Sequence, residues 1–86
     1  MNDLILIRAD DVAARLGESR SKLSLDVRAG LMPPPVRNGK LAVWPAYEVD
    51  AVAHAVIAGA TDDELRSLAR SLVERRAAGK PTTAAA

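Results

Sequence analysis

Two pairs of adjacent carboxylates and a single histidine are the residues with the most potential for chemistry in this chain. The pairs are Asp10-Asp11 and Asp62-Asp63, and the histidine is His54. Adjacent carboxylates can act as a general acid and a general base, and histidine transfers protons near neutral pH. Both pairs, however, stand where helices are expected to begin, and carboxylates stabilise the helix dipole there. His54 has no second ligand or nucleophile pattern beside it. We therefore expect no enzyme, no catalytic residue, no metal site and no cofactor.

The length and composition favour one small soluble domain. The chain has 86 residues and no cysteine, which excludes a disulfide scaffold and a thiolate metal site. A domain of this size has a thin core. The apolar run near the start is too short for a signal-peptide core, and no run approaches a membrane span. We expect an intracellular protein with neither a membrane partner nor a small-molecule substrate.

Positive charge is concentrated in one segment of the chain, residues 19–40. The whole chain has a net charge of +1, but this segment holds five basic residues and one acid, a net charge of +4. The segments on either side are acidic, because residues 1–18 and 41–60 each carry −2. Such a concentration is typical of a nucleic-acid contact, and it also occurs on ordinary solvated surfaces. The elements that carry these charges therefore decide the interpretation.

The basic segment begins with the second of two closely spaced helices. Ala9 or Asp10 is predicted to cap the first helix, which Gly17 ends. Ser19 is a good N-cap for the second helix, and Gly30 fits the position just after its end. Two short helices joined through a glycine turn are typical of a helix-turn-helix, although a generic helical hairpin has the same spacing. The second helix carries an apolar stripe of Leu23, Val27 and Leu31.

A β-hairpin is predicted over residues 36–44, after three consecutive prolines that end the helix. Asn38-Gly39 is a strong hairpin signal, and we predict a type I′ turn in which both residues have positive φ. Arg37 and Lys40 flank this turn, either as solubilising charges or as contacts to DNA. Trp44 is interpreted as a core anchor beneath the hairpin rather than a base-stacking platform, since it has no aromatic neighbours at stacking spacing.

Two more helices are predicted in the second half of the chain. Pro45 suits the first position of the third helix, which ends at Gly59. Thr61 and Glu64 form a capping box that starts the fourth helix, over residues 61–78. A disordered tail is expected over 79–86. The apolar stripes are Val49, Val52, Ala53, Val56 and Ile57 in the third helix and Leu65, Leu68, Ala69, Leu72 and Val73 in the fourth.

This order of elements resembles a known family. Residues 8–52 are similar to the AlpA-like prophage regulators and related excisionases, which are winged helix-turn-helix proteins akin to the DNA-binding half of MerR-type regulators. The matching pieces are DVAARLG at 11–17, SRS at 19–21, RAGL at 28–31, PPPVR at 33–37 and the run from Trp44-Pro45 to Glu48-Val-Asp50. The sequence departs from the family after the SRS triplet, where a Tyr and an Arg are often found and this chain has KLSLD. Because of this departure, we expect contacts with the DNA backbone to be more important than contacts with base edges. Asp26 would repel phosphate if it faced DNA.

The residues and the resemblance together predict a mainly α fold, with a winged helix-turn-helix over 1–60 that has a small β-hairpin wing. The added C-terminal helix over 61–78 lies outside the resemblance and is predicted from its capping box and apolar stripe. The resemblance implies that the helix starting near Ser19 enters the major groove and that the hairpin lies against an adjacent minor groove or backbone. The expected DNA contacts are Ser19, Arg20, Ser21, Lys22, Ser24, Arg28, Arg37, Asn38, Gly39 and Lys40.

The leucines of the fourth helix have two alternative roles. Leu65, Leu68 and Leu72 either pack on the domain's own core or contact a partner, which would be another copy of the chain or a recombinase. The helix spans only about two heptads, too few for a stable coiled coil alone. Since one small module contacts few base pairs, cooperative self-assembly on tandem DNA sites is a further hypothesis.

Three functions remain as alternatives. The leading expectation is a recombination directionality factor (an excisionase) that binds and bends attachment-site double-stranded DNA so that an integrase excises a mobile element. The second is an AlpA-like transcriptional regulator of a prophage or mobile element. The third is a protein-interaction module that uses the C-terminal helix. Each of these places the protein in the bacterial cytoplasm, and the first two associate it with the nucleoid.

Overall fold

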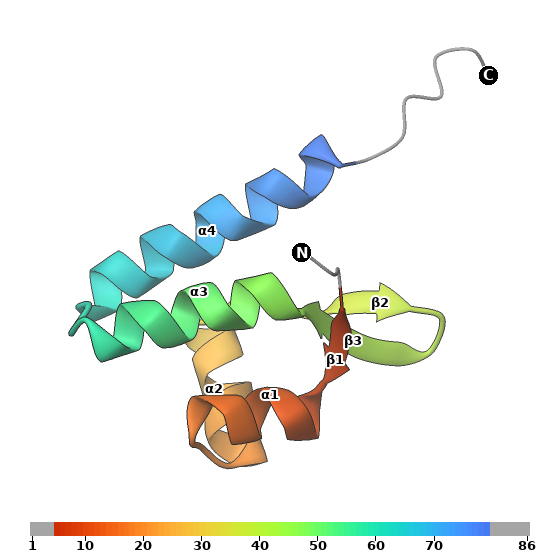
Figure 1. The fold of residues 1–86 in the computed structure, drawn as a ribbon, viewed down its shortest axis with the longest axis horizontal. Helices are drawn as coiled ribbons and strands as arrows, with labels where there is room; N and C mark the ends of the chain where they lie inside the picture. The colour runs from red at the N-terminus through yellow and green to blue at the C-terminus, as the bar shows by residue number, and fades with distance from the viewer. Residues whose placement is uncertain (1–4, 80–86) are drawn as a thin grey trace.

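The computed structural model describes residues 5–79 and consists of four helices and a small three-stranded antiparallel sheet. Figure 1 shows α3 and α4 lying side by side and running in opposite directions, with α1 and α2 beneath them and the sheet at one end. The mainly helical fold with a β-hairpin that the sequence predicts is confirmed at this level. In chain order the elements are β1 (Leu6–Arg8), α1 (Ala9–Leu16), α2 (Arg20–Ala29), β2 (Val36–Asn38), β3 (Leu41–Pro45), α3 (Ala46–Ile57) and α4 (Asp62–Ala78).

The sheet has a strand that the sequence analysis did not predict. β1 pairs antiparallel with β3, which also pairs with β2, so that β3 is the central strand. Ile7 lies opposite Trp44 and is buried, whereas its neighbours Leu6 and Arg8 are exposed. This alternation is the period of two that a half-buried strand requires. It spans only three residues, which is too short to be distinguished from a generic apolar run in the sequence.

The hairpin turn differs from the predicted type. Asn38 pairs with Leu41, so that the two-residue loop is Gly39-Lys40 rather than Asn38-Gly39. Only Gly39 in this loop has a positive φ, of 65°. A positive φ confined to the first loop residue is the pattern of a type II′ turn, which also suits the right-handed twist of the two strands. The glycine was therefore identified correctly, and its position within the turn was wrong by one residue.

Most helix ends follow the predicted capping signals. Gly17 and Gly30 adopt left-handed conformations at the ends of α1 and α2. The Ser19 hydroxyl accepts the Lys22 backbone N–H at 3.1 Å. Thr61 and Glu64 form the reciprocal capping box at the start of α4. The acid pairs at 10–11 and 62–63 lie in first turns, as expected.

Two predicted helix starts were wrong by one or two residues. Arg8, and neither Ala9 nor Asp10, is the N-cap of α1, because the chain enters this helix directly from the extended backbone of β1. Pro45 is the N-cap of α3 rather than its first helical residue, because it still belongs to β3.

One hydrophobic core joins all four helices to the sheet. Trp44 is 4% exposed and its indole N–H donates to the Pro33 carbonyl at 2.8 Å, which confirms it as a core anchor. α4 contributes to the same core, so residues 5–60 and 61–78 pack as one unit. The cluster of buried residues is Ile7, Val12, Ala13, Leu23, Met32, Trp44, Val49, Val52 and Leu72.

The apolar stripe predicted for α3 is only partly buried. Val49 and Val52 are inside, but Val56 is 55% exposed and Ile57 is 81% exposed. The stripe has the correct helical period, yet the last turn of α3 extends past the elements that cover the rest of it. His54 is also exposed, as expected for a surface residue.

A buried ion pair connects α3, α4 and the proline segment. Glu48 in α3 is completely buried and accepts two hydrogen bonds from Arg76 of α4, at 2.8 and 2.6 Å. The same guanidinium donates to the Pro34 carbonyl at 2.8 Å. Both Glu48 carboxylate oxygens therefore have a donor, as a buried charge requires.

Candidate nucleic-acid interface

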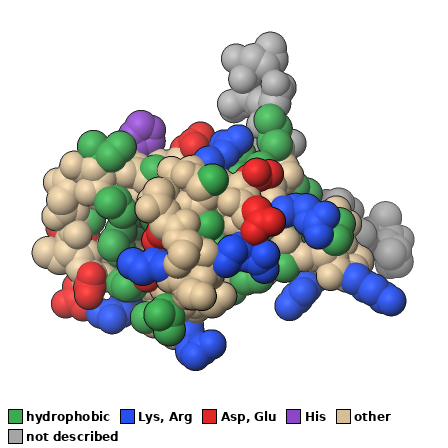
Figure 2. All heavy atoms as spheres, turned by 90° about the horizontal axis from the view of Figure 1, so that it is seen from below, with side chains coloured by type: hydrophobic (Ala, Val, Ile, Leu, Met, Phe, Trp, Pro, Cys, Tyr) green, Lys and Arg blue, Asp and Glu red, His purple; other side chains and the backbone are tan. Residues whose placement is uncertain are grey.

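The residues expected to contact DNA all lie on the surface. Each of the ten is exposed, from Ser19 to Arg28 in and before α2 and from Arg37 to Lys40 in and beside the hairpin. Figure 2, seen from below Figure 1, shows Lys and Arg side chains scattered over the face that it displays, with acids among them. The face is therefore mixed in charge and rich in cations, rather than uniformly basic.

The exposed arc of α2 is formed by residues at spacings of three and four. Ser21, Ser24, Leu25 and Arg28 lie on it, opposite the buried side chain of Leu23. Leu25 is 57% exposed, although an apolar residue of this size is commonly covered. The sequence analysis did not select Leu25. A helical wheel drawn from the buried Leu23 would have placed it almost opposite Leu23, on this arc.

Lys22 and Asp26 lie to one side of that arc. The Lys22 ammonium donates to both Asp26 carboxylate oxygens, at 2.8 and 3.0 Å, and lies 3.8 Å from Glu18. Asp26 is turned inward, with its side chain 17% exposed. The expected repulsion between Asp26 and phosphate is therefore weakened by burial and by the neighbouring ammonium. The hydrogen bonds to Asp26 raise the pKa of Lys22.

Arg20 connects α2 to the hairpin and to β1. A cleft of about 460 Å³ is lined by Arg20, by Lys40 of the hairpin and by Arg8 at the end of β1, together with Asp10 and Asp11 of α1. Arg20 forms a 3.0 Å ion pair with Asp10, but both side chains are largely exposed, at 66% and 80%. Exposed pairs of this kind contribute little free energy, so the guanidinium can exchange Asp10 for another anion. Arg8 was missed in the sequence because the strand that positions it was missed.

The C-terminal end of α2 is held by α4. The Arg66 Nε donates to the Ala29 carbonyl at 3.0 Å, and its guanidinium also pairs with Asp63 at 3.3 Å. Ala29 is the last residue of α2, so its carbonyl has no partner within the helix. Arg66 thus supplies a donor to a helix end and fixes the direction of α2 relative to α4.

The leucines of α4 pack mainly on their own domain. Leu72 is 2% exposed in the core, and Leu68 is partly buried against it. The alternative of a partner contact is wrong for Leu72, since its apolar surface is already covered. Leu65 and Leu68 are each partly buried, and Leu65 lines a groove between α4 and the α1–α2 turn. A partner contact therefore stays a prediction for Leu65 and Leu68.

Comparison with known proteins adds no family to this description, since no family model, no curated protein and no solved structure matches the chain. Among residues 5–79, no helix is long and apolar enough to cross a membrane. Within the same range, no group of three or more His, Cys, Asp or Glu side chains is placed to hold a metal ion.

Proposed function

We propose that this chain is a double-stranded-DNA-binding protein of the winged helix-turn-helix type. In this proposal α2 is the recognition helix and the β2–β3 hairpin is the wing. The observation that carries it is the cleft between α2 and the hairpin, which Arg20, Lys40 and Arg8 line together with two acids, so that cations outnumber acids there. A winged helix-turn-helix protein contacts DNA with a recognition helix and a wing, and in this proposal α2 and the hairpin contact the same duplex.

The exposed arc of α2 supplies groups suited to the major groove. Ser21 and Ser24 can donate to or accept from base edges and phosphates, and Arg28 can contact a phosphate or a guanine. Leu25 can make an apolar contact with a thymine methyl group. Arg37 on the hairpin adds a charge for the adjacent backbone. Lys22 is a weaker candidate than the sequence alone indicates, since its ammonium is bound to Asp26.

Binding to a duplex at increasing salt tests this proposal. Footprinting on DNA that flanks the gene defines the site, and its affinity is then measured over a range of salt concentrations. The logarithm of the affinity should fall with that of the salt concentration, with a slope of about −0.9 per neutralised phosphate.

The variants Arg28→Ala and Arg37→Ala should each weaken binding and reduce this slope by about one. Arg75→Ala is the matched control, because Arg75 is exposed on α4. If all three variants bind the duplex as tightly as the wild type does, α2 and the hairpin are not part of the DNA interface.

As a biological role we propose a recombination directionality factor, which bends attachment-site DNA for an integrase. What supports this role is the resemblance of residues 8–52 to the excisionase group. An excision assay with an integrase and its attachment sites tests it, and Arg28→Ala should lower the yield of excised circles. Unchanged excision in the absence of the protein, together with altered expression from a nearby promoter, would favour the transcriptional regulator instead.

Self-assembly on DNA is part of this role, because one module contacts few base pairs. Analytical ultracentrifugation with a multi-site duplex measures how many copies bind. More than one copy per duplex, bound cooperatively, is the expected result. Strictly one copy per duplex at saturation would contradict assembly and leave the DNA-binding proposal intact.

A further inference from the structure

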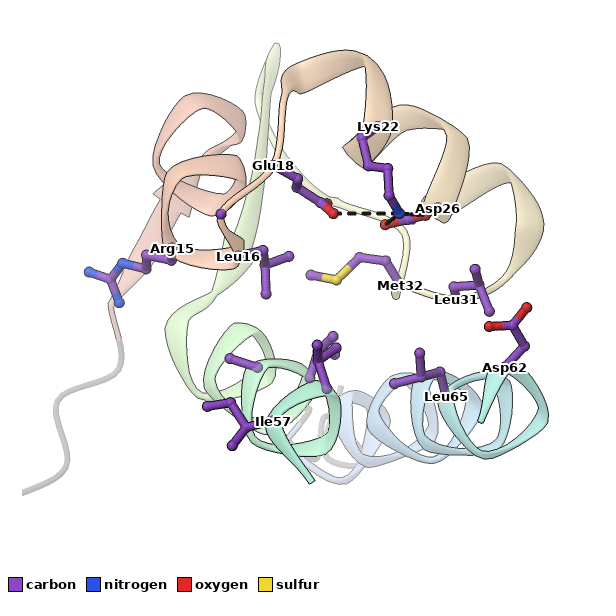
Figure 3. Close-up of a pocket in the computed structure, with 14 residues that line it drawn as sticks. Arg15, Leu16, Glu18, Lys22, Asp26, Leu31, Met32, Ile57, Asp62 and Leu65 are labelled. Carbon is purple, nitrogen blue, oxygen red and sulfur yellow. Dashed lines mark hydrogen bonds and ion pairs between the residues drawn. The ribbon is translucent and has the colours of Figure 1, made fainter. Parts of the chain in front are cut away.

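An apolar groove separates the α1–α2 turn from α3 and α4. Its volume is about 460 Å³, which falls within the range of roughly 300–1,000 Å³ for small-molecule sites. In Figure 3, Met32 lies across its middle, between Leu16 on one side and Leu65 on the other. Val56 and Ile57, the exposed residues at the end of α3, also line it. The groove is thus an apolar hollow that the domain's own side chains leave open.

One end of the groove carries two carboxylates and a single ammonium. Glu18 and Asp26 point toward the same region above Met32, with Lys22 beside them (Figure 3). Lys22 is hydrogen bonded to Asp26, and its distance of 3.8 Å to Glu18 is too long for a hydrogen bond. The second Glu18 oxygen, Oε2, is buried and has no hydrogen-bond partner among the described residues.

The charge of this end is unbalanced. Glu18 and Asp26 are 13% and 17% exposed, so neither carboxylate is well hydrated, and one ammonium serves both. Burial is the main cause that raises the pKa of Glu18, followed by the negative charge of Asp26. Away from this end, the groove is also lined by one base, Arg15, and one acid, Asp62 (Figure 3). The chemistry that complements this end is a cation with N–H donors.

We propose that the groove binds a small organic cation that consists of a primary ammonium joined to an apolar body. The ammonium lies between Glu18 and Asp26, in the place that the Lys22 ammonium now holds. Lys22 can leave this place because its side chain is 57% exposed and its charge is readily hydrated. The apolar body packs against Leu65 and against the exposed Val56 and Ile57 at the end of α3. The ligand is bound and not transformed, and its binding is independent of whether the protein binds DNA.

Tryptamine and its neutral counterpart tryptophol are the probes for this site. Each is titrated into ¹⁵N-labelled protein, and amide shifts are followed by NMR. We expect saturable shifts with tryptamine at the α1–α2 turn and the end of α3, and affinity for tryptophol at least about tenfold lower, as loss of a charge-assisted hydrogen bond implies. No saturable shift with tryptamine, or equal affinity for both probes, would overturn the proposal.

Three variants locate the cation. Glu18→Gln should weaken tryptamine binding by about tenfold, because it removes one negative charge and keeps the shape of the side chain. Lys22→Ala should strengthen it several-fold, because it removes the competing ammonium. Asp50→Asn, an exposed acid on α3, is the matched control and should bind as the wild type does.

Weaker binding by Lys22→Ala would contradict the assignment of the ammonium position. If the Glu18→Gln spectrum shows an unfolded protein, the Lys22→Ala result and the comparison of tryptamine with tryptophol test the proposed site instead.

Discussion

Arg76 of α4 encloses the carboxylate of Glu48, which has no exposed surface, with two hydrogen bonds of 2.8 and 2.6 Å. The two residues are 28 positions apart, and the same arginine also reaches the Pro34 carbonyl. This pair fixes the C-terminal half of α4 to the start of α3 and to the proline segment. Removing one partner leaves a buried charge without compensation, which is much more costly than loss of a surface pair.

Arg76→Ala should therefore destabilise the protein strongly. The expected loss in free energy of unfolding is about 3 kcal/mol, measured by urea denaturation at neutral pH. Arg75→Ala is the matched control. The Arg75 side chain is adjacent in sequence but exposed, so its loss should change the free energy of unfolding by less than about 0.5 kcal/mol. Similar losses in the two variants would mean that the Glu48 pair contributes nothing particular to stability.

Arg66→Ala should loosen the C-terminal end of α2. The variant removes the donor to the Ala29 carbonyl, and the expected cost is about 1 kcal/mol, as for one hydrogen bond to a charged group in a partly exposed position. Amide hydrogen exchange should increase most in the last turn of α2. Arg70→Ala, an exposed arginine one turn further along α4, should leave exchange in α2 unchanged. An equal increase in both variants would refute a specific role for Arg66.

Gly39→Ala should destabilise the hairpin. Gly39 has a φ of 65°, and a residue with a Cβ atom in the left-handed region costs about 1 kcal/mol or more. No other atom lies within 4 Å of the added Cβ, so backbone strain alone is tested. The expected fall in Tm is about 4–8 °C per kcal/mol for a domain of this size. Gly79→Ala serves as the control, because Gly79 has a negative φ, and a similar fall there would argue against strain.

Glu18 should give stability a measurable pH dependence. Its pKa is raised in the folded protein, so the folded state binds the Glu18 proton more tightly than the unfolded state does. Ionisation of Glu18 therefore destabilises the fold as the pH rises above its ordinary value of 4.5. Relative to Glu18→Gln, the wild type should lose stability as the pH rises above 4.5 and through the raised folded-state pKa of Glu18. A difference that is constant with pH, or that changes in the opposite direction, would contradict this assignment.

The capping signals were predictable because they act over a few residues. Ser19, Gly30 and the Thr61–Glu64 box each satisfy backbone groups within one turn of the same helix. Such signals require no knowledge of the rest of the fold. The hairpin was found for the same reason, although the register of its strands moved the turn by one residue.

The surface residues of the candidate interface could be selected from the sequence, but their partners could not. Lys22 and Asp26 are one helical turn apart, so their pairing is a local event that a helical wheel allows. Arg20 and Asp10 belong to different helices, and their contact depends on how α1 and α2 cross. Arg8 joins this surface only because β1 pairs with β3.

The sequence by itself determined the order of the helices, most of their ends and the concentration of positive charge in residues 19–40, because each follows from local propensity and composition. Tertiary structure alone decided that Arg76 pairs with Glu48, that Arg66 caps α2 and that Leu72 belongs to the core. It also decided that Val56 and Ile57 stay exposed, since a stripe with helical period does not reveal where the covering element ends. These features depend on contacts between residues far apart in the chain, and only the packing of α4 against the other elements brings them together.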